Sequence, residues 1–178
     1  MIYYCCVDDA WNERELEQLG ELCSALGPRP AQTFSGTGRM SETAFLQRDD
    51  ANAWVFDRIS GTVNRANEHF RFVLQSFASP QYAEYRADNA GHYDWHIDLE
   101  LGRRGNIDRK LSMTLQLNEG YTGGEFQINL GDPDDPMTLE LPMGRAIFFP
   151  SFLQHRVLPV ISGVRKSLVV WVEGPTFT

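Results

Sequence analysis

The sequence predicts a mainly β fold: a jelly roll, or double-stranded β-helix, with N-terminal α-helices packed on one of its sheets. Two stretches before about residue 70 repeat apolar residues at helical spacing. From about residue 71 to 174, apolar residues instead occur in many short runs. Closely spaced turn signals, such as Gly123-Gly124 and Ser162-Gly163, separate these runs, which is typical of a sandwich or barrel.

The first helix is expected to begin after Asn12 and to end at Gly27. Asn12 is a suitable N-cap, and Glu15 stands three residues later as its capping-box partner. A second helix is expected from residue 49 or 50 to residue 70. One face of each helix is apolar and should pack against the core: Leu16, Leu19, Leu22, Cys23 and Leu26 in the first, and Phe56, Ile59, Val63, Ala66 and Phe70 in the second.

The candidate strands occupy the second part of the chain. Each is a short apolar or alternating run that ends in turn residues. The runs are residues 71–78, 82–87, 92–100, 110–118, 124–130, 137–141, 145–150, 155–160 and 165–174. We therefore expect one domain over residues 1–178, helical over about residues 1–70 and with the jelly-roll core at about residues 71–174.

Length and composition indicate a folded chain and disfavour two kinds of partner. A chain of 178 residues suits one domain, and 42% hydrophobic residues are enough for a sizeable core. The formal net charge of -8 argues against binding to nucleic-acid phosphates or to an anionic membrane, because like charges repel. The sequence carries no signal for an oligomeric state.

The cysteines and the N-terminal segment bear on the cellular setting. Cys5, Cys6 and Cys23 fit neither a disulfide framework nor a zinc-site spacing. Residues 1–13 lack the basic start and the long apolar run of a secretory signal. No stretch approaches the roughly 20 apolar residues of a membrane span. We therefore expect a reducing, cytoplasmic setting.

The segment His96-Ile97-Asp98 is the first candidate for chemistry. Side chains alternate along a strand, so His96 and Asp98 should point to one side, about 7 Å apart along the backbone. Trp95 and Ile97 should then point to the opposite side and pack against the helices or the other sheet. On its own, this short pattern favours an ordinary strand over a metal site.

A third ligand would have to come from another part of the chain, and His69, His92 and His155 are the candidates. His69, near the end of the second helix, suits a capping or surface role. His92 shares the His96 face by parity but lies in a turn, whereas His155 opens a late strand. Two histidines and one carboxylate form the facial triad of non-heme Fe(II) oxygenases, which leaves metal positions open for a cosubstrate and O₂.

Arg165 stands ten residues after His155 and shares one strand face with Ser167, Val169 and Trp171. A guanidinium on the inner face of a jelly roll is costly unless an anion meets it. Its planar fork fits a carboxylate, and Ser167 can donate to the same group. Together with a metal triad, this clamp suits a dicarboxylic 2-oxo acid, with one end on iron and the other on Arg165.

Three groups of motifs follow one another between about residues 82 and 173. They are Tyr85 and Gly91 with "YDWHID" at residues 93–98, "RKLSMTLQLNEGYTGGEFQI" at residues 109–128, and "LPMGRAIFFPSFLQHRVLPVISGVRKSLVVW" at residues 141–171. In this order they resemble the Fe(II)- and 2-oxoglutarate-dependent oxygenases, in particular the prolyl 4-hydroxylase-like branch.

The resemblance implies a role for each matching residue. His96, Asp98 and His155 would ligate Fe(II), with 2-oxoglutarate as cosubstrate, O₂ as oxidant and ascorbate as an optional reductant. Arg165 would bind the distal carboxylate of 2-oxoglutarate, with Ser167 as a helper. Tyr85 would contact the cosubstrate near the metal, although it stands farther from His96 than is usual in the family.

Three apolar positions complete the comparison with the family. Where some members have a cosubstrate-binding tyrosine, this chain has Leu115. Phe126 and Trp171 would be apolar walls of the pocket or plain core aromatics.

The implied reaction is hydroxylation of an unactivated C–H bond. A prolyl residue of a peptide or protein is the leading substrate class, and a free amino acid or other small molecule is the alternative. The loop at residues 99–110 should border the site mouth, where Arg103 and Arg104 either meet an acidic substrate group or face solvent.

Two other interpretations remain open at this point. One is a cupin-like metal-binding protein that uses no 2-oxo acid, and Arg165 argues against it. The other is an inactive family member that acts as a binding module, and the complete ligand set argues against that.

Overall fold

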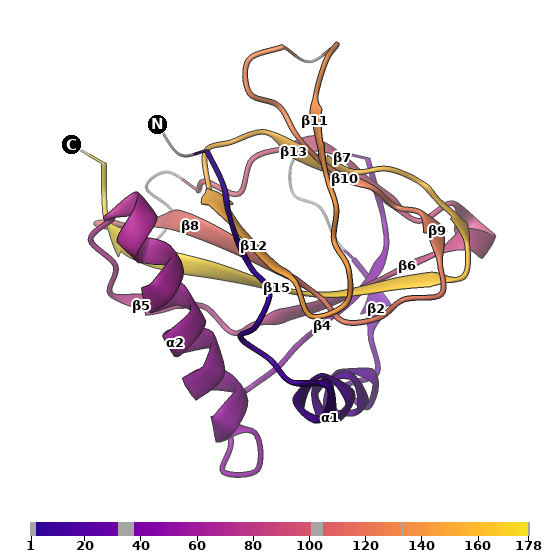
Figure 1. The fold of residues 1–178 in the computed structure, drawn as a ribbon, viewed down its shortest axis with the longest axis horizontal. Helices are drawn as coiled ribbons and strands as arrows, with labels where there is room; N and C mark the ends of the chain where they lie inside the picture. The colour runs from indigo at the N-terminus through magenta and orange to yellow at the C-terminus, as the bar shows by residue number, and fades with distance from the viewer. Residues whose placement is uncertain (1–2, 32–37, 101–104, 133, 178) are drawn as a thin grey trace.

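The computed structural model describes residues 3–31, 38–100, 105–132 and 134–177. Their strands form two facing sheets, with the helices on the outside of the larger one (Figure 1). All the strand pairs run antiparallel. This architecture confirms the predicted fold class, a mainly β jelly roll with N-terminal helices on one sheet.

The larger sheet is built around the two longest strands, β8 and β15. Its order is β1 (Cys5–Val7), β12 (Ala146–Pro150), β8 (Ile107–Gln116), β15 (Val164–Pro175), β6 (Gln81–Arg86), β4 (Glu42–Phe45) and β2 (Arg29–Pro30), and β5 (Ser76–Phe77) also pairs with β15.

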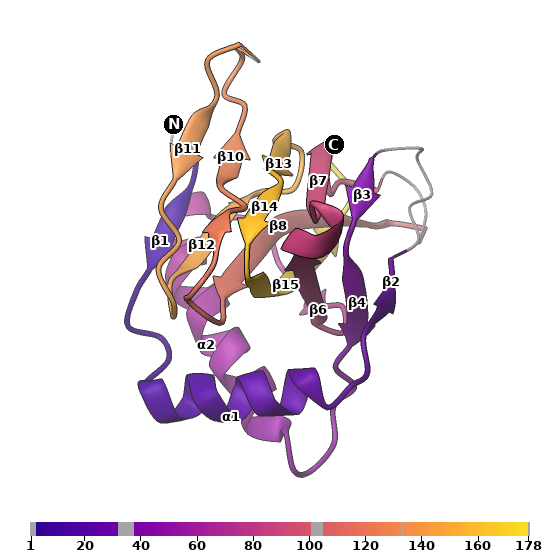
Figure 2. The same cartoon turned by 90° about the vertical axis from the view of Figure 1, so that its right-hand side faces the viewer.

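The smaller sheet faces it across the site. Its order is β11 (Met137–Leu139), β10 (Phe126–Ile128), β13 (His155–Val157), β7 (His92–His96) and β3 (Arg39–Met40). A short ribbon of β14 (Val160–Ser162) and β9 (Thr122–Gly123) and a 3₁₀ turn, η1 (Ala87–Asn89), complete the body. Figure 2 shows the smaller sheet lying above the larger one, with α1 beneath both.

The two helices cover the outer face of the larger sheet. In α1 (Glu13–Ser24), Asn12 and Glu15 form the predicted capping box. Buried residues of α1 and α2 (Ala53–Phe70) share one hydrophobic core with β8 and β15: Leu16, Leu19, Val55, Ile59, Met113, Leu115 and Val170 are among its members. Neither described helix is both long and apolar enough to cross a membrane.

A second core lies between the sheets and includes Ile147, Phe149, Phe126 and Val157. Strand β12 contributes to both cores, because Phe148 packs on the helix side while Ile147 and Phe149 face the smaller sheet. Burial on both faces explains why this strand is apolar throughout.

The N-terminal part contains more strand than the sequence predicts. Strands β1, β2 and β4 extend the larger sheet, and β3 joins the smaller one. These segments have two to four residues each, too short to show a period-2 pattern.

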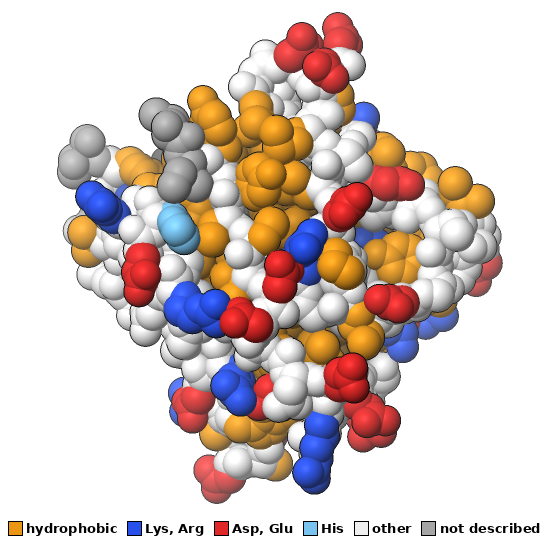
Figure 3. Space-filling model, in the orientation of Figure 1, with side chains coloured by type: hydrophobic (Ala, Val, Ile, Leu, Met, Phe, Trp, Pro, Cys, Tyr) orange, Lys and Arg blue, Asp and Glu red, His pale blue; other side chains and the backbone are white. Residues whose placement is uncertain are grey.

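On the face in Figure 3, acidic and basic side chains are interspersed around apolar areas.

Several predicted boundaries were wrong, and three of them bear on the packing and on the site. Helix α2 begins at Ala53 because the Asp49 carboxylate accepts hydrogen bonds from the N–H groups of Ala51 and Asn52, which forms a turn there. Within residues 71–78, only Ser76–Phe77 is strand. The predicted loop at residues 99–110 is shorter, because β8 already begins at Ile107.

Candidate metal centre and pocket

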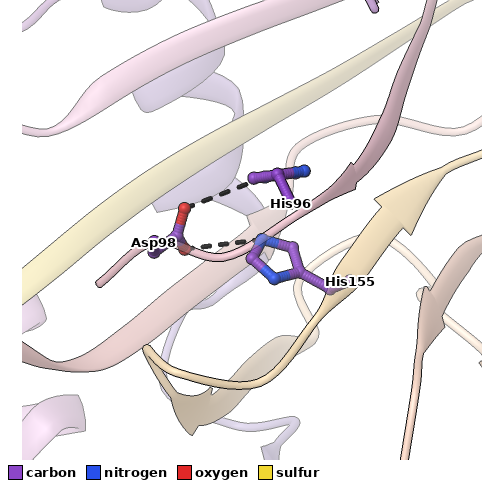
Figure 4. A group of neighbouring side chains, drawn as sticks. All are labelled: His96, Asp98 and His155. Atoms are coloured by element: carbon purple, nitrogen blue, oxygen red, sulfur yellow. Dashed lines mark ion pairs between the residues drawn. The ribbon is translucent and has the colours of Figure 1, made fainter. Parts of the chain in front are cut away.

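Three side chains converge between the two sheets (Figure 4). His96 ends β7, Asp98 follows two residues later, and His155 begins β13, where it pairs with His96 across the ladder. His96 Nε2 lies 3.8 Å from Asp98 Oδ1, and His155 Nε2 lies 3.4 Å from Asp98 Oδ2. One ligand atom from each residue fits within 4.8 Å of the others, close enough to share a metal ion.

Local hydrogen bonds orient both imidazoles. His96 Nδ1 donates to the carbonyl oxygen of Asp94 at 2.8 Å, and His155 Nδ1 donates to that of Leu153 at 3.0 Å. Because Nδ1 carries the proton in this arrangement, Nε2 of each neutral ring keeps its lone pair for a metal. Both Nε2 atoms point toward the Asp98 carboxylate.

The electrostatics of the triad favour the metal-binding protonation states. Burial, with a smaller contribution from the nearby His155, lowers the pKa of His96 to about 3, although Asp98 works in the opposite direction. Burial alone would raise the pKa of Asp98, but the two histidines and the Ser112 hydroxyl together hold it below its ordinary value. At neutral pH the site therefore offers a neutral His96 imidazole and a carboxylate.

A β-bulge in β7 decides which aromatic side chain joins the site. His155 pairs with His96 and Val157 with Tyr93, so the one residue between these pairs in β13 opposes two residues in β7. The extra residue interrupts the alternation, and the Tyr93 ring stacks on the His96 ring with centroids 3.5 Å apart. Strict alternation along the strand would place His92 on this face. His92 instead bonds the Ala90 carbonyl.

The remaining candidate histidine lies elsewhere: His69 is in the last turn of α2. The predicted packing of Trp95 and Ile97 against the helices or the other sheet was wrong. Ile97 is 47% exposed. The guanidinium carbon of Arg156 lies over the Trp95 ring, 4.4 Å from the ring centroid. The reason is that the helices cover the larger sheet, so neither helices nor a sheet cover Ile97, which follows the end of β7.

The triad opens into a pocket with a buried cation in its wall. The four β15 residues predicted to share a face, Arg165, Ser167, Val169 and Trp171, all line it. Tyr85 and Phe126 line it too. Arg165 pairs with Tyr85 across the β15–β6 ladder, and its guanidinium carbon lies 5.5 Å from the Tyr85 ring centroid. Leu115 lies away from the pocket, in the helix-side core.

Arg165 is only 1% exposed. Its Nη1 donates to Ser167 Oγ at 3.3 Å, but Nε and Nη2 have no hydrogen-bond partner within the described part of the chain. A buried guanidinium with unused donors is expensive, and an anion in the pocket would satisfy it. The donors therefore fit the carboxylate of a pocket ligand.

Two further arginines, Arg39 and Arg109, line or border the site, and neither was predicted as a site residue. Arg39 lies 4.5 Å from the Tyr93 ring centroid and donates to Gln81 at 3.1 Å. It belongs to the two-residue strand β3, which shows no period. Arg109 lies 4.1 Å from the Trp171 ring centroid and donates to the carbonyl oxygen of Asp98 at 3.4 Å.

A second bulge explains the position of Arg109. Val172 pairs with Leu111 but Glu173 with Arg109, which leaves Lys110 as the extra residue. The Arg109 side chain therefore lies on the same side of β8 as the Ser112 side chain, which faces Asp98. Arg103 and Arg104, expected at the site mouth, lie outside the described residues.

Residues 80–173 match the family model described as the 2OG-Fe(II) oxygenase superfamily. The chain belongs to this superfamily. The donor set of two imidazoles and one carboxylate fits the Fe(II) of the family name, and the unused donors of buried Arg165 fit a 2-oxoglutarate carboxylate.

Curated relatives of this oxygenase-family chain are named PKHD-type hydroxylases. The one from Colwellia psychrerythraea is 41% identical over 120 residues, which cover 65% of this chain and 53% of the relative. The one from Synechococcus sp. (strain CC9605) is 34% identical over 89 residues, 50% of this chain and 40% of the relative. The chain thus spans about half the length of these relatives.

Solved prolyl hydroxylases share the fold. A Pseudomonas putida prolyl-4-hydroxylase has a TM-score of 0.76 at 21% identity, with 97% of this chain and 93% of that chain covered. A Trichoplax adhaerens prolyl hydroxylase, solved with a hypoxia inducible factor peptide fragment, has a TM-score of 0.75 at 15% identity, with 95% and 82% covered. At these identities the likeness shows the fold alone.

Proposed function

We propose that this chain is an Fe(II)- and 2-oxoglutarate-dependent dioxygenase that hydroxylates an unactivated C–H bond. One observation carries the proposal: a buried His–Asp–His cluster and a buried arginine with unused donors line the same pocket. A metal-binding jelly roll that used no 2-oxo acid would not need Arg165 in that wall. The described chain would act as one catalytic domain.

In this proposal His96, Asp98 and His155 hold Fe(II). Arg165 binds the distal carboxylate of 2-oxoglutarate with help from Ser167, and Tyr85 contacts the cosubstrate. Bound Fe(II) and 2-oxoglutarate together supply the activation of O₂, one oxygen atom ending in the new hydroxyl group and the other in succinate, with release of CO₂.

The chain's own residues supply orientation and a dry site. The hydrogen bonds from Nδ1 hold each imidazole with Nε2 toward Asp98. Phe126 and Phe149 lie beside His155, with ring centroids 5.7 Å and 4.6 Å away, and keep water from that side of the cluster. The Arg165 guanidinium sets the end of the pocket where the cosubstrate carboxylate binds.

A prolyl residue of a peptide or protein is the leading substrate in this proposal. The hydroxylase names of the curated relatives and the prolyl hydroxylase folds of the structural neighbours support it. The Trichoplax protein was solved with a peptide fragment, which supports a peptide substrate. A free amino acid or other small molecule is the alternative. The proposal includes ascorbate as an optional reductant, a cytoplasmic setting, and neither nucleic-acid nor membrane partners.

Anaerobic titration tests the cosubstrate assignment. Wild-type protein with Fe(II) should develop a weak visible charge-transfer band when 2-oxoglutarate is added. Arg165→Met should weaken 2-oxoglutarate binding about 10-fold or more, because a charge-assisted hydrogen bond is lost. Arg48→Met is the matched control, since Arg48 is exposed and pairs with Asp57 on the surface.

Oxygen then tests turnover. On admission of O₂, wild type should form succinate, and a prolyl peptide that is a substrate should accelerate this and gain one oxygen atom by mass. No band with wild type would refute the oxygenase proposal. An unchanged band in Arg165→Met would refute the role of Arg165. Faster succinate formation with a small molecule, but with no prolyl peptide, would favour the alternative substrate.

A further inference from the structure

Asp98 differs from the two histidines in how it is held. Each histidine is oriented by a backbone carbonyl two residues away in its own segment. The Asp98 carboxylate instead accepts a hydrogen bond from the side chain of Ser112, in β8 of the opposite sheet, at 2.7 Å. Among the described residues, Asp98 is thus the one member of the three that accepts a hydrogen bond from a side chain, which a substitution can remove.

Ser112 is itself held by a second serine. Its Oγ lies 2.9 Å from Ser151 Oγ, and both serines are 0% exposed. A hydroxyl has one proton, and an ionised carboxylate only accepts. The Ser112 hydroxyl therefore donates its hydrogen bond to Asp98, so the Ser151 hydroxyl donates a hydrogen bond to Ser112. The hydrogen bonds run in one direction, from Ser151 through Ser112 to Asp98.

Ser151 also holds the backbone of the Asp98 segment. Its carbonyl oxygen accepts the N–H groups of Asp98 and Leu99, each at 2.9 Å. Ser151 directly follows β12 and stands four residues before His155. Through its backbone carbonyl and its side chain, Ser151 therefore connects Asp98 to the turn that leads to His155.

The hydrogen bond from Ser112 makes the two carboxylate oxygens different. Oδ2 accepts the Ser112 proton, whereas no hydrogen-bond donor for Oδ1 is found among the described residues. Oδ1 lies 3.8 Å from His96 Nε2. Oδ2 lies 3.4 Å from His155 Nε2. The hydroxyl thus fixes the rotation of the carboxylate, with Oδ1 toward His96 and Oδ2 toward His155.

We propose that Ser112 and Ser151 are positioning residues that hold the Asp98 carboxylate in its metal-binding orientation, with Ser151 acting through Ser112. The proposal rests on the metal centre of the proposed function. Outer hydrogen-bond partners of metal ligands commonly change metal affinity by about 10–100-fold.

Titration of the metal-free protein with Co(II) tests this without turnover, because the visible spectrum of Co(II) reports both affinity and ligand arrangement. Ser112→Ala should weaken Co(II) binding about 10–100-fold and change the spectrum. Ser112→Thr, which keeps the hydroxyl, should stay near wild type. Ser151→Ala should have a smaller effect, since its carbonyl oxygen remains.

The double variant Ser112→Ala/Ser151→Ala decides whether the serines act in series. If Ser151 acts through Ser112, the double variant should bind Co(II) no more weakly than Ser112→Ala alone. Fully additive losses would overturn the serial arrangement. Ser60→Ala is the matched control, because Ser60 donates to a backbone carbonyl in α2.

The outcomes separate the two proposals. If wild type fails to bind Co(II), the metal centre itself is wrong. If wild type binds and Ser112→Ala binds equally well with the same spectrum, only the positioning role is wrong. Urea unfolding of each metal-free variant identifies a variant that fails to fold. A loss of stability with an unchanged Co(II) spectrum in Ser112→Ala would show that Ser112 acts only in packing.

Discussion

Burial gives single side chains of this protein properties that their residue type does not determine. Arg48 is exposed and paired with Asp57, whereas Arg165 is buried with two unused donor atoms within the described part of the chain. Cys6 is exposed, whereas Cys23 is buried against the helix-side core. The reactivity of each side chain depends on this difference.

The cysteines provide a prediction at the residue scale. Burial raises the pKa of the Cys23 thiol to about 12, so the reactive thiolate is scarce and reagent cannot reach it. Iodoacetamide at about pH 8 should alkylate Cys6 in the folded protein and Cys23 only after unfolding in urea. Peptide mapping measures both. Equal labelling of the two in the folded protein would contradict the burial of Cys23.

At the scale of single elements, bulges place the site residues. The bulge in β7 brings Tyr93 to the His96 ring, and the bulge at Lys110 brings Arg109 to Trp171. The turn before β7 is equally constrained: Gly91 N–H bonds the Arg86 carbonyl, and its own carbonyl accepts the N–H of Val160.

The substitution Gly91→Ala tests this constraint on the turn before β7. A Cβ there would lie 2.5 Å from the backbone nitrogen of Arg86, so β7 must shift. The variant should lose about 1–3 kcal/mol of unfolding free energy and bind Co(II) more weakly, because β7 carries His96. Urea unfolding and Co(II) titration measure the two effects.

Gly61→Ala is the opposite control. Gly61 lies within α2, and a Cβ there meets nothing within 4 Å. This substitution should stabilise the protein by about 0.5–1 kcal/mol through helix propensity, with Co(II) affinity unchanged. A Gly91→Ala variant as stable as Gly61→Ala would refute the close approach of the β6–β7 turn.

At the scale of the whole molecule, the larger sheet separates two hydrophobic cores. The helix-side core contains Phe148 and Leu115, and the core between the sheets contains Phe149, which lies beside His155. The larger sheet, covered on one face by the helices, presents its other face to the His–Asp–His cluster and the pocket.

Phe148→Ala tests this division. The ring is fully buried on the helix side, so its loss should cost about 3–5 kcal/mol of unfolding free energy in urea. The protein that remains folded should keep wild-type Co(II) affinity. Ile161→Ala, at a residue 76% exposed, should change stability by less than about 0.5 kcal/mol. A large loss of Co(II) affinity in folded Phe148→Ala would contradict the separation of the cores.

Much of the fold and the centre of the site could be predicted because they depend on short-range patterns. The capping box at Asn12 and the strands around residues 82–87 and 145–150 follow from local sequence. His96, Asp98, His155 and Arg165 were predicted to share one site, and the structure brings them to one pocket. The short strands β1 to β4 were missed, since two to four residues show no period.

The kinds of element and the chemical groups follow from the sequence alone: two amphipathic helices, a series of short strands, two imidazoles, a carboxylate and a guanidinium. Three further features appear only in the folded chain: Tyr93 rather than His92 joins the site, Ile97 faces outward, and Ser112 holds Asp98. The physical reason is that bulges, strand register and the coverage of each sheet depend on contacts between distant segments, which a local pattern does not record.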